Sequence, residues 1–288
     1  MNLTKLETLD EPISFAKLSA SGNDFIVLDN RDHSFSSAAS MLAQRLCARR
    51  YSVGADGLIL VEKSQQATVK IRYINPDGEE FNTCGNGGRC AARYTHLFVK
   101  DDRNITMETN IGIVKAQIQD KLVKLQLVAP TEISLGRELQ IDGQLFKGNY
   151  VRVGDPHFCV PYKNIRNIDF VTIARKLRHH DALKPDGANV HFYEQTAPDQ
   201  MKVRSFERGV ENETLACGSG CVSTAVSTFR EGKSTPPVTF EPQSGIPVSV
   251  HFQPGEDLGE IYLQGDARLI YRGEATMEAV FGFPETPL

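Results

Sequence analysis

The chain has 288 residues, of which 40% are hydrophobic and 24% are charged, and its formal net charge is −4. These values are typical of a globular protein with one large or two ordinary domains, and they give no reason to expect a nucleic acid or an anionic membrane as a partner. No apolar run approaches the roughly 20 residues that span a bilayer. Residues 1–12 carry three acidic side chains and lack an apolar stretch, so they predict a short extension and no signal peptide.

The chain contains six cysteines, which would suit three disulfides in a small secreted protein. In a chain of this size without a signal peptide, reduced thiols are the expectation, and with them a cytoplasmic location. The six positions are Cys47, Cys84, Cys90, Cys159, Cys217 and Cys221.

The first half reads as short strands around one central helix. A helical pattern covers 37–49, the stretch Asn75-Pro-Asp-Gly78 is typical of a turn, and a second helical pattern follows Cys84. Alternating or apolar runs predict the strands. They lie at 13–18, 25–28, 58–61, 69–74, 105–107, 112–118 and 122–128.

The second half repeats this plan at a nearly constant offset. Lys70-Ile-Arg72 returns 132 residues later as Lys202-Val-Arg204, and Ile105-Thr-Met-Glu108 returns 133 residues later as Val238-Thr-Phe-Glu241. The many short strands favour an α+β fold over a doubly wound parallel sheet. We therefore predict two duplicated domains related by a pseudo-twofold axis, each a curved, mostly antiparallel sheet wrapped around a central helix. We expect residues 1–130, joined by 274–288, to form the N-terminal half, and 131–273 the C-terminal half.

Two cysteine motifs occupy equivalent places in this repeat. Cys84 and Cys217, also 133 residues apart, each lie in a glycine-rich turn before a run with helical periodicity. The N-terminus of a helix offers free N–H groups and a positive dipole end, which bind anions and lower a thiol's pKa from about 8.5 towards neutrality. We expect the two thiols to face each other across an interdomain cleft, where ligand sites are common.

Two opposed thiols suggest one chemistry in particular. A thiolate on one side of a carbon removes a proton, and a thiol on the other side returns one, which inverts a stereocentre. Clustered N–H groups at the two helix N-termini would stabilise the charge that develops on a carboxylate next to that carbon. Glycine suits these turns because a ligand must approach the backbone closely.

A set of motifs in this order closely resembles diaminopimelate epimerase, from about Phe15 to Leu269. The resemblance implies a cofactor-free isomerase that interconverts L,L- and meso-diaminopimelate, in lysine and peptidoglycan precursor synthesis, and that forms a homodimer. The motifs are Ser21-Gly-Asn-Asp-Phe25, Gly54-Ala-Asp-Gly57, Asn75-Pro-Asp-Gly78, Thr83-Cys-Gly-Asn-Gly87 with Arg89-Cys90, Pro156-His157, Ala188-Asn-Val190, Glu207-Arg-Gly209 and Leu215-Ala-Cys-Gly-Ser-Gly220.

The resemblance also implies the roles of individual residues. Cys84 and Cys217 become the acid and base, and Arg208 suits the distal carboxylate because a guanidinium can bind one bidentately. Asp155 and His157 become residues that contact the substrate or tune a pKa. The implied substrate contacts are Asn23, Asn75, Gly85, Asn86, Asn189, Glu207, Arg208, Gly218 and Ser219.

One departure from the family pattern leaves the substrate open. The family usually has Asn-Pro-His where this chain has Asp155-Pro-His157, and an acid there could accept from an ammonium group but could not donate to a carboxylate. An alternative is therefore a racemase of another amino acid, such as histidine, in the same superfamily. A second alternative, from another class, is a thiol redox or anion-binding protein that inverts no carbon.

The remaining cysteines and histidines have plainer interpretations. We expect Cys47, Cys90, Cys159 and Cys221 to be core residues, because free cysteine behaves as a small hydrophobe. No Cys-x-x-Cys spacing occurs, and no ligand is paired in sequence with His157, so the sequence predicts no zinc site. The expected partner is a small amino-acid substrate, with no cofactor, no metal, no nucleic acid and no membrane.

Overall fold

The computed structural model describes residues 11–283, and their contacts divide them into two units. Unit 1 contains the described residues up to Leu125 together with those from Asp266 onwards, and unit 2 runs from Gln126 to Gly265. The sequence placed the boundaries near 130 and 274. The expected N-terminal extension, residues 1–12, lies almost wholly outside the described residues. No helix within 11–283 is both long and apolar enough to cross a membrane.

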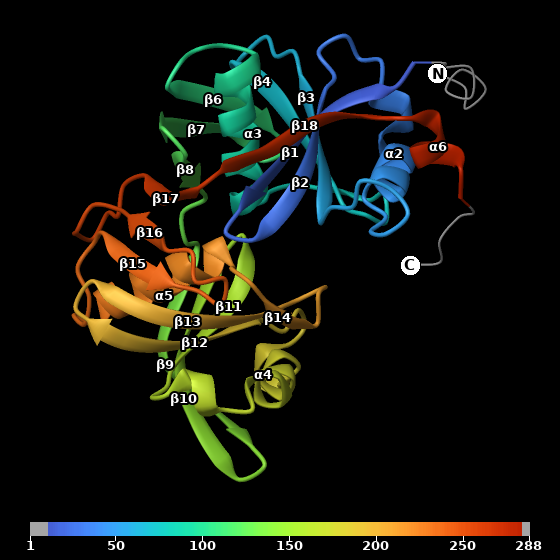
Figure 1. The fold of residues 1–288 in the computed structure, drawn as a ribbon. Coiled ribbons are helices and arrows are strands. Elements are labelled where there is room, and N and C mark those ends of the chain that lie inside the picture. The colour runs from blue at the N-terminus through green and yellow to red at the C-terminus, as the bar shows by residue number, and fades with distance from the viewer. Residues whose placement is uncertain (1–10, 284–288) are drawn as a thin grey trace. The chain divides into compact units, whose positions relative to one another are not determined.

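Unit 1 is a sheet with helices on both faces (Figure 1). Its helices are α2 (Ala39–Leu46), α3 (Gly85–Phe98) and α6 (Met277–Phe281). Its strands are β1 (Ile13–Ala20), β2 (Asn23–Asp29), β3 (Gly57–Glu62), β4 (Val69–Ile74), β5 (Glu80–Phe81), β6 (Asn104–Thr109), β7 (Gly112–Gln119), β8 (Leu122–Leu127) and β18 (Arg268–Ala275).

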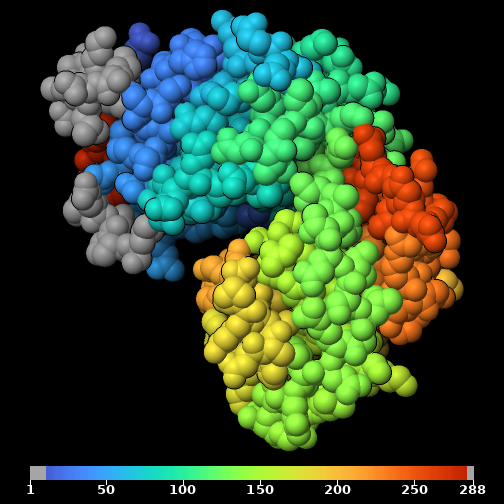
Figure 2. Space-filling view, turned by 180° about the vertical axis from the view of Figure 1, so that it is seen from behind, coloured from blue at the N-terminus to red at the C-terminus, as the bar shows by residue number. Residues whose placement is uncertain are grey.

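Unit 2 has the same plan, with α4 (Phe170–Arg178) and α5 (Gly218–Arg230) as its helices. Its strands are β9 (Glu132–Ile141), β10 (Gln144–Val153), β11 (Asp155–Pro161), β12 (Asn189–Ala197), β13 (Gln200–Glu207), β14 (Asn212–Thr214), β15 (Val238–Glu241), β16 (Val248–His251) and β17 (Ile261–Asp266). The hairpin between β9 and β10 forms one end of this unit (Figure 2).

Strand pairing shows the duplication directly. In unit 1, β1–β2 is antiparallel, β2–β3 parallel, β3–β4 antiparallel and β4–β6 parallel. In unit 2, β10–β11, β11–β12, β12–β13 and β13–β15 follow the same sequence of directions. In unit 2, β9 pairs with β10. In unit 1 the equivalent partner of β1 is β18, which comes from the far end of the chain. The predicted α+β fold of two duplicated, mostly antiparallel domains is confirmed.

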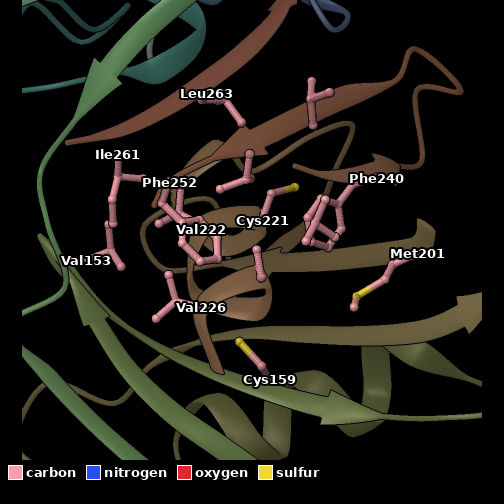
Figure 3. Packing of buried hydrophobic residues seen from close by; sticks show 14 of the residues in the cluster. Val153, Cys159, Met201, Cys221, Val222, Val226, Phe240, Phe252, Ile261 and Leu263 are labelled. Carbon is pink, nitrogen blue, oxygen red and sulfur yellow. The ribbon is translucent and has the colours of Figure 1, made fainter. Parts of the chain in front are cut away.

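Side chains that alternate along each strand supply a separate core on each face of the sheet. In unit 2, Phe158 and Val160 join the cluster that packs on α4, whereas Cys159 between them joins the cluster that packs on α5. Cys159 and Cys221 lie among apolar side chains beside α5 in Figure 3. Cys47 and Cys90 are likewise buried, so the expectation that these four cysteines are core residues is confirmed.

Both central helices begin at a glycine-rich turn, and small residues there let the helix approach the sheet. A Cβ added to Gly88 would come within 2.6 Å of a methyl carbon of Leu125, and one added to Gly218 would come within 2.6 Å of Leu263. The N-termini of α3 and α5 are therefore held against strands of their own unit. This packing fixes the place of the cysteine that precedes each helix.

Candidate active site

Cys84 is the N-cap residue of α3. Its backbone is extended, its sulfur accepts a hydrogen bond from the Gly87 amide at 3.3 Å, and its carbonyl accepts from Gly88 at 2.7 Å. A sulfur that accepts from an amide at a helix N-terminus is in the position that stabilises a thiolate. Cys84 is partly exposed, so a ligand can reach this sulfur.

A buried arginine organises the turn that carries Cys84. Arg89 has no exposed surface, and its guanidinium donates to the Ser21 hydroxyl at 3.0 Å and to the side-chain carbonyl of Asn86 at 2.9 Å. It also donates to the carbonyls of Gly85 and Asp266. Charge-assisted bonds to four groups join the first turn of α3 to β1 and to the end of β17. In the sequence, Arg89 appears only as part of the first cysteine motif. Sequence analysis did not predict that it anchors the turn.

Asn23 lies beside this anchor. Its amide nitrogen donates to Asp56 at 2.8 Å, and its side-chain carbonyl accepts from Asn86 at 3.3 Å. Asp56 also accepts from Arg49 at 2.8 Å, and Arg49 in turn pairs with Asp24. The structure thus brings together Asn23 and Asn86, two of the implied substrate contacts. The side-chain carbonyl of Asn23 already accepts one protein donor.

Asn75 begins the turn that the sequence predicted after β4. Its carbonyl accepts from Gly78 at 2.9 Å, and Gly78 has φ of +89°, a conformation that glycine adopts without strain. The side chain is partly exposed at the end of β4.

Cys217 caps α5 as Cys84 caps α3, but its surroundings differ. It is buried, with 4% of its surface exposed, and its sulfur lies 3.6 Å from the Ser219 hydroxyl. Burial and the nearby Glu207 carboxylate raise the pKa of Cys217 well above its usual range, and the Ser219 hydroxyl and Gly220 amide lower it by less. The prediction that the helix N-terminus lowers the pKa of this thiol is wrong, because desolvation outweighs the dipole.

Glu207, at the end of β13, lies beside this thiol. The Glu207 carboxylate accepts a short hydrogen bond from Thr214, and burial raises the pKa of Glu207 despite that bond. The Arg208 amide donates to the side-chain carbonyl of Asn189 at 2.7 Å, and its guanidinium pairs with Asp155. Asn189 therefore holds the backbone of Arg208, and Asp155 holds its guanidinium.

His157 lies close to Cys217 and belongs to a buried row of hydrogen-bonded polar side chains, called the polar chain below, that the sequence did not predict. Its Nδ1 lies 2.8 Å from Nε2 of His191, and Nδ1 of His191 lies 2.9 Å from the Ser205 hydroxyl. All three residues lie on the α5 face of the sheet, on β11, β12 and β13. The edge of His191 packs against Gly220, where an added Cβ would come within 2.2 Å of the ring. Burial lowers the pKa of His157 to about 3 and that of His191 well below its usual range.

The structure gives His157 neighbours with ligand atoms that the surrounding sequence does not contain. One nitrogen of His157, one nitrogen of His191 and the sulfur of Cys217 all lie within 4.8 Å of one another. These residues are 34 and 26 positions apart along the chain, on two strands and a helix cap, so no local spacing could reveal them. The parallel pairing of β11 with β12 brings the two histidines together.

The equivalent row in unit 1 is apolar. The pairings of β2 with β3 and of β3 with β4 place three residues at the positions of His157, His191 and Ser205. These residues are Phe25, Ile59 and Tyr73. The fold is therefore built equally well with apolar side chains in this row, so its architecture does not require the polar chain beside Cys217. Burying polar groups carries a cost in stability, and such groups often mark a functional site.

Comparison with known proteins agrees with this geometry. The family model for diaminopimelate epimerase matches residues 15–130 and 149–270. The chain is 39% identical over 264 residues to the diaminopimelate epimerase of Chlorobaculum tepidum, an alignment that spans 90% of this chain and all of the relative. It is 34% identical over 280 residues to that of Aquifex aeolicus, across 93% of this chain and 99% of the relative.

More distant solved structures share the fold. A phenazine biosynthesis protein of the PhzF family from Bacillus anthracis aligns with a TM-score of 0.69 and 16% identity, over 92% of this chain and 99% of that one. A probable proline racemase from Agrobacterium radiobacter K84 aligns with a TM-score of 0.66 and 13% identity, over 93% and 95%. With its family match across both units and relatives of 30–39% identity over about nine-tenths of its length, the chain belongs to the diaminopimelate epimerase family.

Proposed function

We propose that this chain interconverts L,L- and meso-diaminopimelate with two cysteines as acid and base, in lysine and peptidoglycan precursor synthesis. The observation that carries the proposal is the presence of Cys84 and Cys217 as N-cap residues of equivalent helices, one in each unit of a family member. In this scheme one sulfur removes the proton from the substrate carbon and the other sulfur returns one. The substrate carboxylate takes N–H groups from the first turns of α3 and α5, at Gly85, Asn86, Gly218 and Ser219.

The surroundings of Cys217 support a specific starting state. Burial and Glu207 raise the pKa of this thiol, so it enters the reaction protonated and serves as the acid. Cys84, whose sulfur accepts from the Gly87 amide, serves as the base in that direction. After one turnover the protonation states are exchanged, and the enzyme is ready for the reverse reaction.

Arg208 binds the distal carboxylate of the substrate. Its guanidinium, 37% exposed, pairs with the more exposed Asp155 and can turn to a ligand carboxylate while its amide stays fixed by Asn189. Asn23, Asn75 and Glu207 complete the set of polar contacts to the ammonium groups. If Asp155 changes the substrate preference, a panel of L-amino acids including histidine will reveal a second substrate that is turned over faster than diaminopimelate.

Replacing either catalytic thiol tests the two-cysteine scheme. Because proton transfer by a positioned group contributes about 10²- to 10⁴-fold, Cys84→Ala and Cys217→Ala should each lose at least that factor in kcat. Chromatographic separation of the L,L and meso isomers measures the rates, and circular dichroism verifies the fold. The matched control is Cys90→Ala, which removes a buried core thiol six residues from Cys84 and should lose far less activity. A single catalytic variant that retains more than a few per cent of turnover would rule out the scheme.

The reaction should need neither pyridoxal phosphate nor a metal. Two helix N-termini and exclusion of water supply the stabilisation that an electron sink would otherwise give. We expect full activity after dialysis against a chelator and after treatment with hydroxylamine, measured with the same assay. Loss of activity after either treatment, restored by the missing component, would contradict this mechanism.

We further propose that His157 stays neutral and orients the groups around Cys217. Its folded-state pKa of about 3 lies below the ordinary value of 6.5, so the stability that depends on its neutral form is complete above pH 6.5 and is lost as the pH falls towards 3. His191 acts in the same direction. Imidazole nitrogen shifts in NMR should show both rings neutral at pH 5, and the free energy of unfolding should fall between pH 6.5 and 4. His157→Gln should flatten that fall. Rings that titrate near pH 6.5 would contradict the assignment.

A homodimer in the cytoplasm completes the proposal. Strand β18, paired with β1, exposes consecutive apolar side chains, with Leu269 at 38%, Ile270 at 51% and Tyr271 at 45% of full exposure. An apolar strand of this kind suits a second copy of the same surface. The cytoplasm is the compartment that keeps two catalytic thiols reduced.

Sedimentation velocity tests the dimer. The wild-type protein should sediment as a dimer at micromolar concentration, and Ile270→Asp should shift it to monomer, because a charge at the centre of the interface is costly to desolvate. Val210→Asp, a change at an equally exposed apolar residue of unit 2, is the matched control and should leave the dimer intact. A dimer unaffected by Ile270→Asp would place the interface elsewhere.

A further inference from the structure

The polar chain beside Cys217 has one atom without an evident task. Nε2 of His157 is buried and makes no well-formed hydrogen bond among residues 11–283, although the ring has a weak polar contact with the backbone of Val153. The residue has no exposed surface, and its other nitrogen is already paired with His191. A buried imidazole nitrogen without a partner costs free energy, so a structure that keeps one commonly has a ligand for it.

Three potential ligand atoms converge at this place. A nitrogen of His157, a nitrogen of His191 and the sulfur of Cys217 lie within 4.8 Å of one another, and the three residues are 0%, 0% and 4% exposed. In unit 1 the same sheet positions hold Phe25 and Ile59, so the convergence belongs to one unit only. Neither the fold nor the duplication accounts for it.

We propose that His157, His191 and Cys217 bind Zn²⁺, and that the bound ion inhibits the enzyme by capturing the Cys217 sulfur. Imidazole nitrogen and thiolate sulfur are the ligands that Zn²⁺ prefers, at about 2.0–2.1 Å and 2.3 Å. Two nitrogens and one sulfur around a tetrahedral ion lie roughly 3.3–3.6 Å apart, so ligand atoms that now lie within 4.8 Å of one another must approach by no more than about 1.5 Å. A water molecule takes the fourth position.

The balance of protons and charge favours binding. The Cys217 thiol releases one proton to solvent and its sulfur binds as a thiolate, while both imidazoles bind in the neutral form after their mutual hydrogen bond opens. The Glu207 carboxylate, which hydrogen-bonds the Cys217 thiol, lies outside the three ligands. Its charge and that of the thiolate together match the two positive charges of the ion.

Binding of the ion is independent of the reaction proposed above, whereas inhibition rests on it. A Cys217 sulfur that is bound to zinc can neither donate nor accept a proton. Turnover should therefore fall as zinc fills the site, and a chelator should restore turnover. The ion-free enzyme is the active form, which is consistent with activity that survives dialysis against a chelator. Zinc thus acts here as a reversible inhibitor and takes no part in the chemistry.

Cobalt spectroscopy provides the direct test, because Co²⁺ occupies zinc sites and reports its ligands. Adding Co²⁺ to the reduced, chelator-treated full chain should produce a thiolate-to-cobalt charge-transfer band and the intense visible bands of a tetrahedral ion. One equivalent of Zn²⁺ should displace the Co²⁺ and remove both kinds of band. Cys217→Ala should abolish the charge-transfer band, and His157→Gln and His191→Asn should each weaken Zn²⁺ binding at least tenfold by calorimetry.

The controls distinguish this site from one that includes Cys84 and from one that includes His180. Cys84→Ala should keep the charge-transfer band, and His180→Gln, a change at the residue that precedes the short 3-10 turn Asp181–Leu183, should keep the full Zn²⁺ affinity. A band lost in Cys84→Ala and kept in both histidine variants would overturn the proposal, because the ion would then bridge the two catalytic thiols. A spectrum without a charge-transfer band would also overturn it. Near-ultraviolet circular dichroism of each variant shows whether the fold is intact, and the two histidine variants test the site independently of Cys217.

If binding is confirmed but zinc leaves turnover unchanged, the proposed role of Cys217 fails while the metal site stands. If turnover depends on Cys217 but no variant changes Zn²⁺ binding, the metal site fails while the proposed function stands. The two failures are therefore distinguishable.

Discussion

The site depends on the direct packing of a helix N-terminus against a sheet. In each unit a cysteine ends an extended segment, and the helix that follows begins with glycines that the sheet would not accept with side chains. Because the first turn cannot move away from the strands, its N–H groups stay grouped around one point. A negative charge is stabilised at that point without reorganisation of the protein during the reaction. The same packing leaves the cysteine sulfur at the N-terminal end of the helix.

Duplication gives the enzyme two such points, and later divergence makes them chemically unequal. Cys84 is partly exposed, and its neighbours at the equivalent sheet positions are apolar. Cys217 is buried beside Glu207 and a chain of two imidazoles and a hydroxyl. An isomerase that runs in both directions needs one thiol and one thiolate at the start of each turnover. Different surroundings on a common scaffold can bias which sulfur holds the proton, as the raised pKa of Cys217 illustrates.

The sequence predicted the architecture well because the relevant signals are local or periodic. The strand at 69–74 was predicted with the bounds of β4, and the offset between Cys84 and Cys217 revealed the repeat that strand pairing confirms. Boundaries of single elements were less accurate, as with α2, which begins at Ala39 after a short 3-10 turn. A C-terminal strand that completes the first unit begins at Arg268, earlier than the segment from 274 that the sequence joined to it.

The site was predicted less completely, for physical reasons. Motifs identify residues near the glycine turns, but the partners of a buried group come from strands that pair far along the chain. His191 and Ser205 carry no motif and become visible only through the register of β12 on β13. The error on the pKa of Cys217 has the same origin, since a helix N-terminus can be inferred from sequence and the depth of burial cannot. The resemblance implied that Asn189 contacts the substrate and that Asp155 contacts it or tunes a pKa, but it did not reveal that both hydrogen-bond with Arg208.

The central claim is that two different groups carry the proton away from and back to one carbon. A single-turnover reaction in D₂O, started from L,L-diaminopimelate with its ordinary hydrogen at both α-carbons, measures this directly. The sulfur that starts the turnover as a thiol has exchanged its hydrogen with D₂O, and it delivers that deuterium, so the meso product formed early should carry one deuterium at the inverted carbon. The L,L-diaminopimelate that remains should carry none. Deuterium appearing in the remaining substrate as fast as in the product, or product that keeps the original hydrogen, would mean that one group does both tasks and would contradict the two-cysteine account.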